Sequence, residues 1–104
     1  MSTFKNYLIG QGQANSSADT HIKTLIGFVE WAENENLETE DCSYNDLLAY
    51  VRYLRKQKLK QRTIQVYLNT LKHYYNWQID LERREDNPVN NIVIKGVQRR
   101  MLYD

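Results

Sequence analysis

The polar side chains best suited to binding another molecule are concentrated between Lys58 and Trp77. Hydrophobic residues in this stretch recur at three- and four-residue spacing, which predicts a helix with one apolar face. A solvated helix face usually mixes Glu with Lys, because oppositely charged pairs four residues apart stabilise a helix. The polar face here has basic and amide side chains and no acid: Arg62, Gln65, Asn69, Lys72, His73 and Asn76. Such side chains bind phosphates and base edges, so this face predicts a contact with nucleic acid.

Charge is unevenly distributed along the 104 residues, although the formal net charge is only +1. Residues 1–51 contain two lysines and eight acids, whereas residues 52–100 contain twelve Lys or Arg and four acids. No acid occurs in the 24 residues from Lys56 to Ile79. This asymmetry indicates a polyanionic partner for one side of the molecule, with chance clustering in a short chain as the alternative.

The residue inventory gives little support for catalysis. His21 and His73 are the only histidines, and neither has a Cys or an acid at metal-ligand spacing. Cys42 lies in an acidic segment, which would raise its pKa and weaken it as a nucleophile. No Gly-rich phosphate loop or Ser nucleophile motif occurs. We therefore expect no catalytic residue, no metal and no cofactor in this chain.

The sequence also lacks the marks of a secreted or membrane protein. A single cysteine cannot form an internal disulfide, and no apolar run approaches the 18 or so residues of a membrane span. The N-terminus has neither the basic start nor the apolar stretch of a signal peptide. We expect a cytoplasmic protein.

Four helices are expected to position the polar face, because glycine and proline are scarce and no period-2 alternation indicates strands. The first helix is predicted over residues 3–9, and the second over residues 17–35 with Ser16 or Ser17 as its cap. Ser43 should cap the third helix together with Asp46. The fourth helix is predicted from residues 60–62 to about residue 84, before Pro88.

These helices should share one core. The predicted buried stripe of the second helix consists of Ile22, Leu25, Ile26, Val29 and Ala32, and that of the third consists of Leu47, Leu48, Val51 and Leu54. Most of the aromatic residues are expected in the core or at its edge, notably Phe28, Trp31, Tyr50 and Tyr75.

The order of these features resembles the N-terminal, SAM-like core-binding domain of the tyrosine recombinases, the phage integrase family. The matching positions in the second helix are Ser17, Thr20, Leu25, Phe28 and Trp31. Those in the fourth helix are Thr63, Ile64, Leu68, Leu71, Lys72, Tyr74 and Tyr75, followed by an exit at Asn87-Pro88-Val89. The resemblance covers roughly residues 4–100 and implies an all-α, four-helix SAM-like orthogonal bundle with an extended C-terminal linker.

The resemblance also implies a domain organisation. Residues 1–88 would form the core-binding domain, and residues 89–104 would begin a linker to a catalytic domain absent from this chain. The family's catalytic Arg, His and nucleophilic Tyr have no counterparts here, and Tyr103 lacks their surroundings. Ile94-Lys95 stands where the family often has Pro-Lys. The chain looks like part of a longer recombinase, with a stand-alone small protein as the alternative.

What the resemblance implies about function is a clamp on duplex DNA, with the second and fourth helices against the major groove. Its partners would be double-stranded DNA, the catalytic domain of the same parent chain and other recombinase protomers, and no membrane. The residues carried over as DNA contacts are Thr20, Lys23, Arg62, Thr63, Gln65, Asn69, Lys72 and His73, with His21 as a secondary candidate and Lys95, Arg99 and Arg100 following the backbone. The alternative is a helical protein-interaction module without DNA binding, anchored by exposed aromatics such as Tyr44, Tyr50 and Tyr53.

Overall fold

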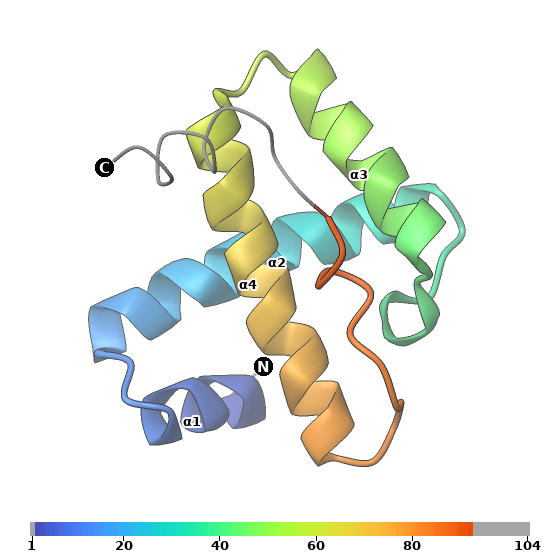
Figure 1. Ribbon diagram of the computed structural model, residues 1–104. Helices are drawn as coiled ribbons and strands as arrows, with labels where there is room; N and C mark the ends of the chain where they lie inside the picture. The colour runs from blue at the N-terminus through green and yellow to red at the C-terminus, as the bar shows by residue number, and fades with distance from the viewer. Residues whose placement is uncertain (1, 93–104) are drawn as a thin grey trace.

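Four α-helices and one short 3-10 helix form the protein in a computed structural model, which describes residues 2–92 (Figure 1). The elements are α1 (Ser2–Gly10), α2 (Asn15–Asn34), η1 (Thr39–Asp41), α3 (Tyr44–Lys56) and α4 (Gln61–Asp80). No strand occurs in this part of the chain. The expected all-α, four-helix bundle is therefore confirmed.

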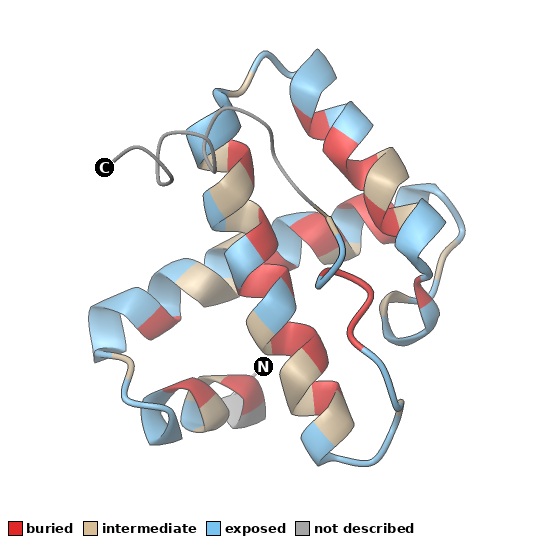
Figure 2. Ribbon diagram, viewed as in Figure 1, coloured by how far each residue is buried: buried red, intermediate tan, exposed pale blue. Residues whose placement is uncertain are grey.

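The helices cross one another instead of lying in parallel (Figure 1). α4 crosses α2, α1 packs against both of them, and α3 packs against α4. The buried residues lie on the faces that the helices turn toward one another (Figure 2). The largest hydrophobic side chains in this core, each less than 2% exposed, are Phe4, Leu8, Leu25, Phe28, Leu47, Ile64, Leu68, Leu71 and Tyr75.

The buried face of α2 is rotated relative to the predicted stripe. Ile26 was expected in the core but is 42% exposed, whereas the other four members of that stripe are buried or half-buried. The physical reason is an aromatic cluster that joins α2 to α3. The ring of Tyr50 lies 4.9 Å from that of Phe28 and 5.0 Å from that of Trp31. These large rings define the inward face of α2, and Ile26 is left on the outside.

The start of α3 follows the prediction. The Ser43 hydroxyl accepts a hydrogen bond from the Asp46 amide at 3.2 Å, and the Asp46 carboxylate accepts one from the Ser43 amide at 3.0 Å. Two amides that a helix start leaves without partners are thereby satisfied, which is the capping box expected from the sequence.

The predicted cap of α2 is wrong. The helix begins at Asn15, so Ser16 and Ser17 lie inside its first turn, and Ala14 at the cap position offers no side-chain hydrogen bond. The Ala14 carbonyl already accepts the first helical bond, from the Ala18 amide at 2.9 Å. The preceding turn contains Gly12 at φ 96°, a left-handed conformation that suits glycine. The chain can therefore enter the helix two residues earlier than the serines indicated.

The end of α4 also differs from the prediction, which placed it near Arg84. The helix stops at Asp80, and Glu82 adopts a left-handed φ of 59°. The guanidinium of Arg84 lies over the Tyr75 ring at 4.9 Å and donates to the backbone carbonyl of Cys42 at 2.9 Å. These contacts bring the chain back toward the start of α3, which is incompatible with four more helical residues.

The segment after α4 runs back alongside this helix (Figure 1). The Asn87 side-chain amide donates to the Lys72 carbonyl and to the Asn76 side chain, both at 3.0 Å, and its oxygen accepts from the Val89 amide. Val89 is buried in the core. Residues 93–104 lie outside the described residues, so the predicted domain boundary at residue 88 stays a prediction.

Candidate nucleic-acid interface

The outward face of α4 carries the polar residues expected from its sequence. Arg62, Asn69 and Lys72 are exposed, whereas Thr63, Gln65, His73 and Asn76 are half-buried. This division follows from the opposite face, which packs Ile64, Leu68, Leu71 and Tyr75 into the core. The exposed residues are therefore held on a rigid helix, which fixes their spacing for a partner.

Val66 also belongs to this face and was not among the predicted site residues. Its side chain is 46% exposed and lies one turn after Arg62 and three residues before Asn69. The positions 62, 66, 69 and 73 share one stripe of a helix, and this spacing was the signal available in the sequence. An exposed valine between polar side chains can contact the methyl group of a thymine.

The two amide side chains on this face are bonded to each other. The Gln65 side-chain amide donates to the Asn69 side-chain oxygen at 3.1 Å. Asn69 keeps its own NH₂ group for a partner, and Gln65 keeps its carbonyl oxygen. The pair can therefore present a donor and an acceptor side by side, which is the pattern that bidentate reading of a base requires.

The predicted contacts on α2 lie near the point where this helix crosses α4. Thr20 and Lys23 are both exposed. The Thr20 hydroxyl donates to the Ser16 carbonyl at 3.1 Å, so it keeps only its acceptor capacity. Lys23 forms no ion pair within the described residues, which leaves its charge available.

The two histidines are brought together by this crossing, although they lie far apart in the sequence. The ring centroids of His21 and His73 lie 5.2 Å apart with an edge-to-face angle of 66°. His21 Nδ1 lies 2.6 Å from Thr70 Oγ1. Partial burial lowers the pKa of both imidazoles, with further lowering by His73 at His21 and by Lys72 at His73.

Positive charge is concentrated in α3, in the loop that follows it and in α4. The sequence has no acid from Leu47 to Ile79, so the acid-free run extends well before Lys56. The ion pairs within residues 2–92 use Lys5, Arg83 and Arg84 and none of the basic residues in that run. The run contributes the following basic residues: Arg52, Arg55, Lys56, Lys58, Lys60, Arg62 and Lys72.

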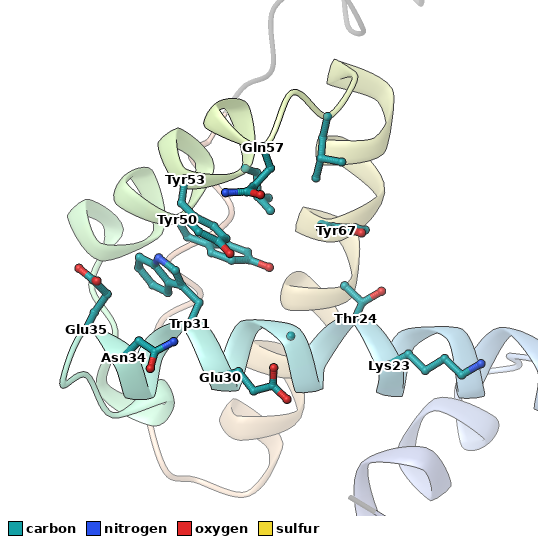
Figure 3. A pocket seen from close by; sticks show the side chains of 13 residues that line it. Lys23, Thr24, Glu30, Trp31, Asn34, Glu35, Tyr50, Tyr53, Gln57 and Tyr67 are labelled. Atoms are coloured by element: carbon teal, nitrogen blue, oxygen red, sulfur yellow. The ribbon is translucent and has the colours of Figure 1, made fainter.

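An open pocket of about 490 Å³ lies between α2, α3 and α4 (Figure 3). Aromatic side chains line two sides of it, with Trp31, Tyr50 and Tyr53 on one side and Tyr67 on the other, and two acids, Glu30 and Glu35, also line it. Lys23 lies at the end of the pocket away from Trp31 (Figure 3). Tyr50 is only 3% exposed and is part of the core, which corrects its expected role as an exposed anchor.

The described residues contain no group of three or more potential metal ligands. Cys42 is buried, and this burial is the largest cause of the rise in its pKa, ahead of the acidic neighbours on which the sequence argument depended. None of the described helices is both long and apolar enough to cross a membrane. The predicted contacts Lys95, Arg99 and Arg100, and also Tyr103, lie outside the described residues.

A four-helix bundle with one basic, acid-free helix face is thus the setting of the candidate site. Comparison with protein families matches residues 1–82 to the phage integrase N-terminal SAM-like domain. The chain belongs to this family, as the sequence pattern indicated.

Individual relatives give a more specific likeness. Tyrosine recombinase XerC of Staphylococcus aureus strain COL is 30% identical over 69 residues, which cover 66% of this chain and 23% of that protein. The same enzyme of strain JH9 is 29% identical over the same share of each chain. The chain thus matches less than a quarter of these relatives' length. No solved structure matches it significantly.

Proposed function

We propose that this chain is the DNA-binding, core-binding part of a site-specific tyrosine recombinase. It would hold one side of the duplex at the recombination site, as one half of a clamp. A catalytic domain elsewhere in the parent protein would cut and rejoin the strands, and other protomers would assemble on the same DNA. Residues 1–88 would form the binding domain and residues 89–104 the start of the linker.

The observation that carries this proposal is the acid-free face of α4 in a domain of the phage integrase family. Arg62 and Lys72 are exposed and form no ion pair within the described residues. Thr63 and Arg62 follow the start of α4, where unpaired backbone amides and the helix dipole favour a phosphate. Asn69 and Gln65 supply base-reading groups farther along the helix.

The salt dependence of DNA binding tests this proposal. Each phosphate neutralised contributes about −0.9 to the slope of log affinity against log salt, so Lys23, Arg62 and Lys72 together predict a slope of about −2.7. Fluorescence anisotropy with a labelled duplex over a range of salt concentrations measures it. As a matched control, Arg83→Gln should leave the slope unchanged, because the Arg83 cation is paired with Glu40. Binding that is absent at low salt, or independent of salt, would refute the proposal.

The aromatic pocket favours one other function, a protein-interaction module. Tyr53 lines this pocket and is 41% exposed, and Tyr44 elsewhere on α3 is 42% exposed. Exposed tyrosines are common anchors at protein interfaces. This alternative predicts self-association that persists at high salt in light scattering. A monomer whose DNA binding is sensitive to salt would exclude it.

A further inference from the structure

Two imidazoles from different helices meet at the edge of the face proposed to bind DNA. His21 on α2 and His73 on α4 are half-buried, and their ring centroids are 5.2 Å apart. His21 directly follows the exposed Thr20, and His73 directly follows the exposed Lys72. A single ligand at this crossing could therefore contact both helices.

The hydrogen bonds leave donor capacity for such a ligand. His21 Nδ1 is bonded to Thr70 Oγ1 at 2.6 Å, and Thr70 is buried. No residue in the described part of the chain forms a hydrogen bond with His21 Nε2 or with either nitrogen of His73. A protonated imidazole donates from both nitrogens. Protonated His21 would thus keep its bond to Thr70 and offer its Nε2 proton to an acceptor outside the protein.

The surroundings supply no anion to match such a proton. The charged residues within four positions of His21 or His73 along their helices are Asp19, Lys23 and Lys72. Asp19 is paired at 2.8 Å with Lys5, the only charged residue of α1. No carboxylate within residues 2–92 forms an ion pair with either histidine. Burial lowers the pKa of both imidazoles, His73 lowers that of His21 further, and Lys72 lowers that of His73 further.

We propose that His21 and His73 form a proton-dependent site for a nucleic-acid phosphate at the crossing of α2 and α4. The phosphate supplies the negative charge that the protein itself does not place there. Binding of DNA then takes up a proton, and DNA binding strengthens as the pH falls. This inference rests on the proposed function, because it assumes that this face meets DNA.

The affinity for a labelled duplex, measured by anisotropy at constant salt between about pH 7.5 and pH 5.5, tests the proposal. A rise of one unit in an imidazole pKa on binding corresponds to binding that becomes up to about tenfold tighter as the pH falls below both pKa values. We expect this gain in the unmodified chain, and we expect the double variant His21→Gln, His73→Gln to lose it. Arg62→Gln is the matched control, since it should weaken binding at every pH and keep the gain.

A second measurement needs no variant. The imidazole proton signals of the unmodified chain, followed by NMR through a pH titration, should show a higher pKa with duplex DNA than without it. Circular dichroism at both pH limits checks that the fold is retained. The inference is overturned, and the proposed function kept, if DNA binds with the same pH dependence in the unmodified chain and in the double variant His21→Gln, His73→Gln. Absence of DNA binding at every pH overturns both.

Discussion

Individual residues on the outer face of α4 would play different parts in the proposed contact with DNA. Arg62 has a fixed positive charge and several donors, which suit a phosphate but carry no sequence information. Asn69 has one donor group and one acceptor, which match the paired positions on an adenine edge. Because Gln65 donates to the Asn69 oxygen in the free protein, a base read by Asn69 alone would have to share or displace that bond, whereas a base read by the pair would leave it in place.

Two alanine substitutions separate these roles. Arg62→Ala should weaken binding to all duplex sequences alike and make the salt slope shallower by about 0.9. Asn69→Ala should reduce the preference for the best sequence by about 1–3 kcal/mol while affecting other sequences little. Anisotropy against a panel of duplexes measures both. Equal losses on all sequences for Asn69→Ala would contradict its base-reading role.

For the individual helices, the local sequence predicted the start of α3 correctly but not the start of α2. Ser43 and Asp46 form a reciprocal pair of bonds that needs only residues three positions apart, so the sequence was sufficient. The start of α2 has no such pair, and the serines near it proved to be helical residues. A candidate capping residue is thus informative when its partner is also present.

A matched pair of serine substitutions tests this difference. Ser43→Ala should lower the free energy of unfolding by about 1 kcal/mol, because the Asp46 amide loses its acceptor. Ser17→Ala should be close to neutral, since Ser17 is exposed within the first turn of α2. Urea unfolding followed by circular dichroism gives both values. Equal destabilisation by the two changes would show that Ser43 acts by something other than capping.

Asn87 ties the segment after α4 to the helix, and its removal should be costly. Asn87→Ala leaves the Val89 amide without its side-chain acceptor in a buried setting, and it also removes the donor to the Lys72 carbonyl. We expect a loss of about 1–3 kcal/mol in the free energy of unfolding. Asn90→Ala is the control, because Asn90 is exposed. If both variants unfold at the same urea concentration, the Asn87 bonds do not stabilise the fold.

For the whole molecule, the sequence predicted the class of fold and most of the polar face. Helical periodicity and the order of motifs were sufficient to predict the four-helix bundle. Most of its core residues lie on the apolar face of a helix, and such a face can be recognised from local sequence. Features that depend on contacts between distant residues were missed. The contacts of Arg84 end α4 early, the aromatic cluster around Tyr50 leaves Ile26 exposed, and the helix crossing pairs His21 with His73.

Amide chemical-shift mapping with duplex DNA at low salt would show which residues of this molecule contact DNA. We expect the largest shifts in residues 60–76 of the α4 region and around Thr20–Lys23 on α2. The exposed tyrosines of α3 should change little. Absence of shifts in residues 60–76, or shifts confined to the pocket around Tyr53, would show that DNA does not bind to the polar face of α4.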